Sequence, residues 1–324
     1  MTIFFDRRMS SLPILSLNSP TLSAELYTAC KDTGFFYLTD HGIPQDFLDS
    51  VINLSRQFFL EASSEQKFEI RRKTVEEGGD GARGYQVVGE NVTKGQRDWH
   101  EAVDFYREWD VDSQTEGFLR GENLWPSHPP ELRDVLKEYV QRCQEIGTQL
   151  VKAMGEALGE GDVFVNATRK SFWVMRMIGY PPLADDAGNE GGVSCGEHTD
   201  YGCVTLLLAD STPNALQVQS HDGKSWINAN PVPGAFVVNI GDMIERWTNG
   251  EWKSTNHRVI HRGSNFRVSV PFFFEPDFDA VVSPLPKCVE RTGGKLKYER
   301  VVYGQHLVGK ASTNFYGGEQ ENGT

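Results

Sequence analysis

The segment Gly196–Gly202 places a histidine and an aspartate two residues apart, as His198 and Asp200. In a strand or at its exit, residues i and i+2 point to the same side, so both side chains can reach one ion while Thr199 faces away. A neutral imidazole and a carboxylate suit a first-row transition metal, and a second histidine would complete the ligand face that leaves iron(II) with open positions. An isolated His-x-Asp triplet is common by chance, so the prediction depends on residues further along the chain.

The third ligand has four candidates downstream of Asp200, namely His221, His257, His261 and His306. His257 is favoured because it precedes a β-rich run, and the 57 residues that separate it from Asp200 (257 − 200) allow several strands to return to one pocket. His221 lies in a Ser-His-Asp-Gly segment that is typical of a surface turn, and His261 follows an apolar pair. The alternative is that each histidine is an ordinary core or surface residue.

An Arg-x-Ser pattern begins ten residues after His257 (267 − 257), with Arg267 and Ser269 on the same side of a predicted strand. The planar guanidinium matches a carboxylate, and the serine adds a hydroxyl donor. Together they could hold the far carboxylate of a dicarboxylate whose other end chelates the metal, and 2-oxoglutarate has that shape. The alternative is an ordinary cross-strand salt bridge.

A helical part and a strand-rich part must position these residues. The predicted helices are Glu131–Leu158, one beginning at Ser19-Pro20, one near Pro44 and a final one near Lys297–Val308. The predicted strands of the second half are Trp173–Ile178, Val204–Leu208, Ala235–Ile240 and Arg267–Phe274. The Gly-rich stretch Val75–Thr93 is expected to be a loop with one hairpin. Strands at this spacing predict an all-antiparallel sandwich or jelly roll with helices around it, folded as one unit.

Composition narrows the class of protein. The 324 residues carry 32 Lys and Arg against 45 Asp and Glu, a net charge of −13, which argues against a nucleic-acid partner. The odd number of cysteines, without CxxC spacing, indicates reduced thiols in a cytoplasmic location. The acidic charge likewise argues against an anionic membrane as a partner. No apolar run is long enough to span a membrane, so no membrane span is expected.

At this point the chain resembles a known family, the isopenicillin N synthase-like branch of the 2-oxoglutarate- and iron(II)-dependent dioxygenases. Each matching stretch is weak alone, but the combination is specific and spans most of the chain. The stretches are TGFFYLTDHGI at 33–43, RMIGYPP at 176–182, GEHTDYGCVTLLL at 196–208, NGEWKSTNHRVIH at 249–261 and FRVSVPFFFEP at 266–276. The segment RGYQVVGENVTKG at 83–95 is closest to plant and microbial members described only as probable dioxygenases.

The resemblance implies a mostly β fold with flanking helices (α+β), whose core is a distorted double-stranded β-helix, or jelly roll. It implies one oxygenase unit over residues 1–324, with an N-terminal dioxygenase-type region at 8–125 and a catalytic core at 170–280. The implied iron ligands are His198, Asp200 and His257, and Arg267 and Ser269 would hold 2-oxoglutarate with Tyr180 nearby. The expected cofactors are iron(II), 2-oxoglutarate as co-substrate and O2, with ascorbate as an additional reductant.

The implied reaction couples oxidative decarboxylation of 2-oxoglutarate, to succinate and CO2, with hydroxylation, desaturation or cyclisation of a small molecule. The expected substrate is an organic or amino acid, and the expected assembly is a monomer or weak homo-oligomer. The candidate substrate-binding residues are Arg83, Tyr85, Arg176, Tyr201 and Phe274. Three alternatives remain: an oxidase of the same fold that does not use 2-oxoglutarate, a metal-bound protein without turnover, and a zinc hydrolase, which the absence of an HExxH glutamate disfavours.

Overall fold

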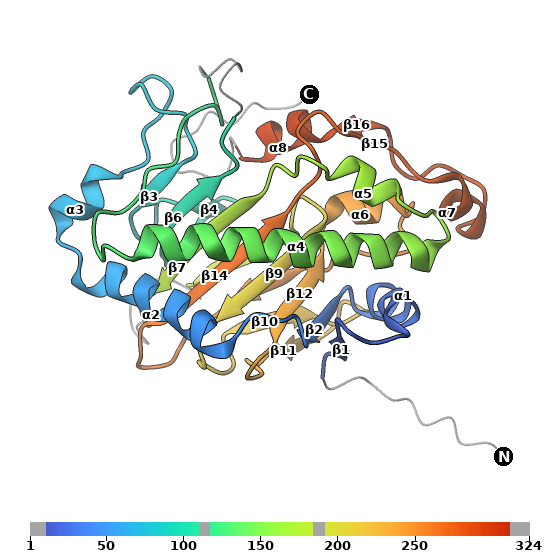
Figure 1. The fold of residues 1–324 in the computed structure, drawn as a ribbon, viewed down its shortest axis with the longest axis horizontal. Helices are drawn as coiled ribbons and strands as arrows, with labels where there is room; N and C mark the ends of the chain where they lie inside the picture. Colours follow the sequence, from blue (N-terminus) through green and yellow to red (C-terminus); the bar gives the residue numbers. More distant parts are fainter. Residues whose placement is uncertain (1–10, 110–116, 184–191, 312–324) are drawn as a thin grey trace.

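Two β-sheets packed face to face form the centre of the molecule (Figure 1). The computed structural model describes residues 11–109, 117–183 and 192–311. The large sheet has the strand order β1 (Ile14–Ser16), β2 (Phe35–Thr39), β12 (Phe236–Ile240), β9 (Val204–Ala209), β14 (Arg267–Phe274), β7 (Val174–Tyr180), β6 (Glu101–Tyr106) and β3 (Gly84–Gln86). The small sheet has the order β11 (Trp226–Asn228), β10 (Leu216–Gln219), β13 (His257–Val259) and β8 (Cys195–His198).

Two short hairpins lie outside these sheets. They are β4 (Val92–Thr93) with β5 (Gln96–Arg97), and β15 (Val281–Val282) with β16 (Val301–Val302). The helices are α1 (Leu22–Asp32), α2 (Gln45–Glu61), α3 (Ser64–Glu69), α4 (Leu132–Leu158), α5 (Val163–Ala167), α6 (Asp242–Trp247), α7 (Pro286–Arg291) and α8 (Tyr303–Ala311). Within the described residues, no helix is long and apolar enough to cross a membrane.

Helices α1, α2 and α4 cover the face of the large sheet that the small sheet leaves free. Helix α4 runs across this face in contact with β14 and β9, and it packs against α1 and α2 (Figure 1). Its apolar stripe, which includes Leu136, Tyr139 and Leu150, is fully buried. A second apolar cluster lies between the sheets, where Ile178 and Tyr180 of the large sheet meet Leu216 and Val218 of the small one. Strands β8 and β13, which carry His198 and His257, therefore belong to a sheet that packs on this core.

Most predicted elements are confirmed, including the helix to Leu158 and the strand Arg267–Phe274. The prediction of a wholly antiparallel core was wrong at one edge, because β1 and β2 are parallel and α1 provides the crossover between them. The first helix begins at Leu22 rather than at Ser19-Pro20. The final helix begins only at Tyr303, because the residues just before it pair as strand β16 with β15.

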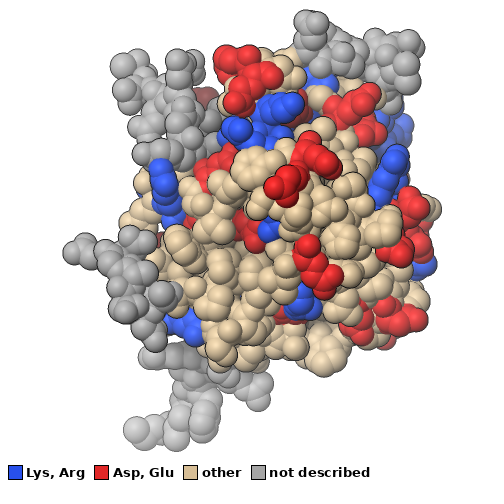
Figure 2. Space-filling model, turned by 90° about the vertical axis from the view of Figure 1, so that its left-hand side faces the viewer, with Lys and Arg blue, Asp and Glu red and all other residues tan. Residues whose placement is uncertain are grey.

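The surface carries both signs of charge. On the face shown in Figure 2, acidic and basic side chains are interspersed, with uncharged areas between them. The chain as a whole is acidic, with a net charge of −13.

Candidate iron and 2-oxoglutarate site

The structure brings together one cluster of two histidines and an aspartate, from two neighbouring strands of the small sheet and the loop after one of them. Strands β8 and β13 are antiparallel with His198 opposite His257, and Asp200 follows the end of β8. The Nε2 atoms of His198 and His257 lie 3.7 and 3.6 Å from Oδ1 of Asp200. The ligand atoms of all three lie within 4.8 Å of one another, so they can face a single ion.

Backbone carbonyls set the orientation of both imidazoles. Nδ1 of His198 lies 2.8 Å from the carbonyl oxygen of Gly196, and Nδ1 of His257 lies 3.1 Å from that of Thr255. When Nδ1 donates to this carbonyl, Nε2 of each ring is left on the Asp200 side for a metal. Burial opposes protonation of His198, but contact with Cys195 and the charge of Asp200 raise its pKa to about 10, so a metal must displace the proton of this ring. Burial, with the neighbouring charge of His198, lowers the pKa of His257 to about 4, so this ring is neutral at pH 7. A neutral ring is the form that binds a metal.

The aspartate is held through its other oxygen. Oδ2 of Asp200 accepts hydrogen bonds from the side chains of Asn239 on β12 (2.7 Å) and Thr205 on β9 (2.5 Å). Burial alone would raise the pKa of Asp200, but the charges that His257 and His198 carry when protonated and these two hydrogen bonds outweigh it, so the pKa lies below its ordinary value. The carboxylate is therefore ionised and its Oδ1 is left for a metal.

The loop after Asp200 is clamped on two sides. Backbone N–H groups at the start of α6 donate to it, from Asp242 to the carbonyl of Asp200 (2.8 Å) and from Met243 to that of Gly202 (2.9 Å). The carboxylate of Glu275 occupies the space that a Cβ on residue 202 would need, so this position must be glycine. Burial, with the nearby charge of Asp200, raises the pKa of Glu275 to about 8.

Arg267 lies buried without a partner for two of its donors. It is only 2% exposed, and within the described chain neither its Nε nor its Nη1 has a hydrogen-bond acceptor. Its guanidinium carbon lies 4.7 Å from the centroid of the Tyr180 ring, and Ser269, also buried, is two residues further on the same strand face. A buried cation is costly unless an anion compensates it. The donor set thus fits the carboxylate of 2-oxoglutarate.

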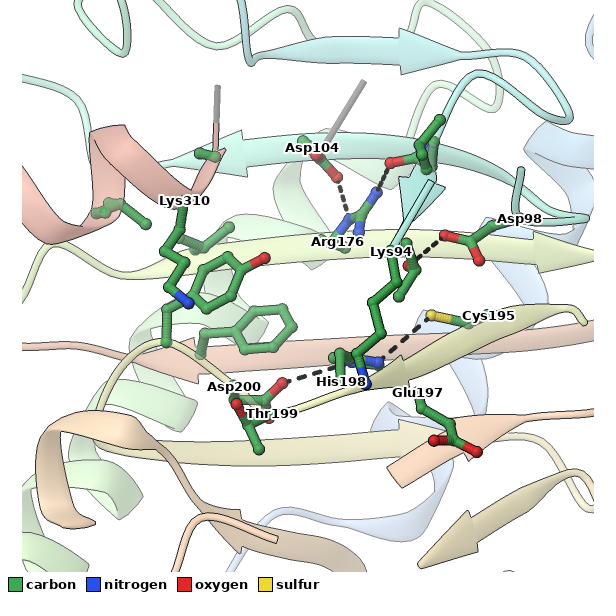
Figure 3. Close-up of a pocket in the computed structure, with 18 of the residues that line it drawn as sticks. Lys94, Asp98, Asp104, Arg176, Cys195, Glu197, His198, Thr199, Asp200 and Lys310 are labelled. Atoms are coloured by element: carbon green, nitrogen blue, oxygen red, sulfur yellow. Dashed lines mark hydrogen bonds and ion pairs between the residues drawn. The ribbon is translucent and has the colours of Figure 1, made fainter. Parts of the chain in front are cut away.

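Beside the metal ligands lies a cavity of about 420 Å³, which is in the usual range for small ligands (Figure 3). Its walls come from the β4–β5 hairpin, strands β6 and β7, the metal-ligand loop and helix α8. Its charged lining residues are Lys94, Asp98, Asp104, Arg176, Glu197, Asp200, Glu275 and Lys310, together with His198.

Two of the predicted substrate residues line this cavity. Tyr201 lies next to the metal-ligand loop, with the ammonium of Lys310 5.9 Å from its ring centroid. Arg176 also lines the cavity, but its Nε donates to Asp104 at 2.5 Å and its Nη2 donates to Asn91 at 2.9 Å. The charge of Arg176 is therefore largely balanced within the protein, as Figure 3 shows.

Three other predicted substrate residues lie elsewhere. Arg83 is buried in an ion pair with Asp80. The hydroxyl of Tyr85 donates to Glu101 at 2.7 Å, and this ring is not part of the cavity wall. Phe274 packs against α4 at Gly147 on the opposite face of β14, and the ring in the cavity is that of Phe273. Side chains alternate along a strand, so choosing the adjacent phenylalanine reversed the face.

Sequence reasoning missed Lys94, Lys310, Asp104 and Glu275 among the cavity residues. No local motif marks a lysine on a hairpin or on a C-terminal helix as facing a distant metal site. A second group of residues that could hold a metal also went unnoticed, formed by Asp98, His100 and Cys195.

Comparison with known proteins agrees with this geometry. The family model described as the 2OG-Fe(II) oxygenase superfamily matches residues 165–276, and the model of the N-terminal region of the non-haem dioxygenase in morphine synthesis matches residues 9–128. The homoarginine-6-hydroxylase 2-ODD-C23 of Glycine max is 43% identical over 298 residues, covering 90% of this chain and 88% of the relative. The homoarginine-6-hydroxylase 2-ODD-C23.1 of Arabidopsis thaliana is 41% identical, covering 90% and 89%.

Solved structures similar to this chain include proteins in complex with 2-oxoglutarate. The chain superimposes on a full-length Neurospora crassa protein in complex with alpha-KG with a TM-score of 0.79 at 26% identity, over 93% of this chain and 95% of that one. It also matches JOX2 in complex with 2OG, Fe and JA, with a TM-score of 0.76 at 28% identity, over 91% and 83%.

Fold and site together define a jelly-roll oxygenase that depends on iron(II) and 2-oxoglutarate. The chain belongs to the 2OG-Fe(II) oxygenase superfamily. The expected fold, reaction class and cofactors are confirmed at this level.

Proposed function

We propose that His198, Asp200 and His257 are the iron ligands, and that Arg267, Ser269 and Tyr180 hold the far carboxylate of 2-oxoglutarate. The close approach of the three ligand atoms supports the first assignment. The two partnerless donors of buried Arg267 support the second. Arg267 and Ser269 lie two residues apart on β14, so their side chains share a face and offer the carboxylate a positive charge and a hydroxyl donor.

The substrate, we infer, is a cationic amino acid of the homoarginine type, and the reaction is its hydroxylation. Relatives of that name at 41–43% identity, aligned over 90% of the chain, carry this proposal. The cavity supports it, because a zwitterion with an additional cationic end needs both carboxylates and cations in its walls. Both are present, in Glu197 on one hand and Lys94 and Lys310 on the other.

Iron(II) and 2-oxoglutarate, when bound, supply dioxygen activation coupled to decarboxylation, with one oxygen atom entering succinate and the other the substrate. The protein's own residues orient and shield. Asn239 and Thr205 keep Asp200 ionised and hold its carboxylate by Oδ2, so that Oδ1 faces the two histidines. Phe273 and Val174 give the cavity an apolar wall beside the metal ligands, which excludes water from the carbon that reacts.

The test is a succinate-release assay of the iron(II)-loaded enzyme with 2-oxoglutarate and a panel of homoarginine, arginine, lysine and small organic acids. Homoarginine should give the strongest stimulation, together with a product heavier by one oxygen atom in mass spectrometry. Stimulation by an organic acid, with none by any cationic amino acid, would contradict the substrate proposal and leave the cofactor assignment intact.

We further propose that the enzyme acts as a single unit in the cytoplasm, as a monomer or weak homo-oligomer. All its cysteines are free thiols, and four of them are buried, which supports a reducing location. Light scattering of the purified chain tests the assembly.

A further inference from the structure

The β4–β5 hairpin overhangs the cavity with a lysine at its tip. Its two-residue turn is Lys94-Gly95, and both residues have positive φ, 49° and 81°. Such a turn matches the twist of the two strands it joins and is characteristic of tight hairpins. The backbone of Lys94 is thus held in one conformation at the rim of the cavity.

This hairpin is tied to the strand that carries the metal ligands. The buried carboxylate of Asp98 accepts a hydrogen bond from the Thr93 hydroxyl at 2.7 Å and another from the backbone N–H of Gly196 at 2.8 Å. A Cβ at Gly196 would lie 2.7 Å from Cβ of Thr93, so the two segments touch at a position that only glycine fits. The hairpin therefore keeps a fixed place relative to His198, two residues beyond Gly196.

The side chain of Lys94 extends from the hairpin into the cavity beside His198, as Figure 3 shows. Among the cations of the cavity wall, Arg176 is balanced by Asp104 at 2.5 Å and also bonds Asn91. Lys94, by contrast, has no hydrogen bond or ion pair to any residue in the described ranges 11–109, 117–183 and 192–311. Lys94 is exposed at the mouth of the cavity, so its solvated ammonium is available to a ligand there.

We propose that Lys94 binds the carboxylate of the substrate. This inference rests on the proposed function, because it assigns one end of the amino-acid substrate to one residue of the same site. An ammonium on a flexible stem is a compact donor that reaches a carboxylate from the rim of a pocket. The hairpin is secured to the metal-ligand strand, so the carboxylate contact also sets how far the rest of the substrate lies from the iron ligands.

The experiment compares ligands with and without the carboxylate. Binding of homoarginine and of its decarboxylated counterpart, 5-aminopentylguanidine, is measured by calorimetry under nitrogen, with iron(II) and 2-oxoglutarate present. Lys94→Gln should weaken homoarginine binding by about tenfold or more, as expected for one lost charge-assisted hydrogen bond. The affinity for 5-aminopentylguanidine should stay unchanged. Equal effects on both ligands, or no effect on either, would overturn the proposal.

Arg97→Gln is the matched control, since it removes one positive charge from the same hairpin at an exposed position outside the cavity wall. It should change neither affinity. Lys310→Gln tests the other lysine of the wall, and a carboxylate-specific loss there but not in Lys94→Gln would overturn the assignment.

The two proposals fail differently. If the wild-type enzyme acts on another acid rather than homoarginine, the substrate proposal fails. Lys94→Gln must still weaken the binding of that acid and leave the binding of its decarboxylated form unchanged. If no carboxylate-bearing compound binds the wild type, the Lys94 assignment fails as well. Retention of the weak visible absorption of the iron(II)–2-oxoglutarate complex in Lys94→Gln shows that the variant is folded and loaded.

Discussion

The two walls of the site are built by opposite means. The wall proposed to hold the metal and 2-oxoglutarate includes buried side chains at strand positions, His257 on β13 and Arg267 on β14, each supported by the packed sheets. The wall proposed to face the substrate includes the β4–β5 hairpin and helix α8, which lie outside both sheets, together with residues of β6 and β7. Under the proposed assignments, the residues that bind iron and 2-oxoglutarate lie on the rigid scaffold, and residues on peripheral segments contribute to the choice of substrate.

The largest effect is expected at the rigid wall. Replacing Asp200 or His257 by Ala removes one of three ligand atoms, and turnover should fall by roughly a thousandfold or more. Iron content and succinate release measure this, with circular dichroism as the control for folding. Turnover near the wild-type rate in either variant would remove the distinction between the two walls.

Arg267→Ala should come next. Loss of the buried cation should weaken 2-oxoglutarate binding by about 2–5 kcal/mol, and substrate affinity should change far less. Anaerobic titration of the visible absorption of the complex gives the affinity directly. Arg267→Lys, which keeps the charge but not the planar fork, should recover only part of the loss. An unchanged 2-oxoglutarate affinity in Arg267→Ala would mean that another cation anchors the co-substrate.

Asn239→Ala leaves all three ligands in place and removes one hydrogen bond from Oδ2 of Asp200. Iron affinity should fall roughly 10- to 100-fold, which is the usual effect of losing a partner behind a ligand. Competition with a chelator measures the affinity. A wild-type affinity would show that Thr205 alone orients the carboxylate.

Glu275 tests the clamp behind the metal-ligand loop through pH. Because burial raises the pKa of Glu275 to about 8 from its ordinary value of 4.5, the folded protein holds this proton more tightly than the unfolded chain. Its contribution to stability is therefore fully present below pH 4.5 and is lost as the pH rises towards 8. Urea unfolding of the metal-free protein at several pH values should show that Glu275→Gln flattens this decline, by an amount of the order of a few kcal/mol. Parallel curves for both proteins would contradict the assigned pKa.

The smallest effect is expected at Tyr85, which lies outside both walls. Tyr85→Phe removes one hydrogen bond to Glu101, so unfolding should become easier by about 1 kcal/mol, with KM for substrate and 2-oxoglutarate unchanged. Thermal unfolding and steady-state kinetics measure the two quantities. A clear rise in the substrate KM would show that Tyr85 takes part in substrate binding after all.

By itself the sequence was sufficient for the parts of the molecule that depend on local pattern. Because residues i and i+2 of a strand point to the same side, the spacing predicted that His198 and Asp200 share a side, and likewise Arg267 and Ser269. Helical periodicity predicted the helix that ends at Leu158. These predictions hold because side-chain direction follows from local backbone geometry. The prediction for Phe274 was wrong by one residue, and in a strand one residue means the opposite face.

Only the tertiary structure decided which distant segments share the site. Lys94 and Lys310 are separated by most of the chain, yet both line one cavity, and Arg83 and Tyr85 are turned away from it into partners of their own. Strand pairing of β8 with β13 brought His257 rather than His261 to the cluster. Packing and strand register determine which distant residues come close in space, and neither produces a motif of fixed spacing in the sequence.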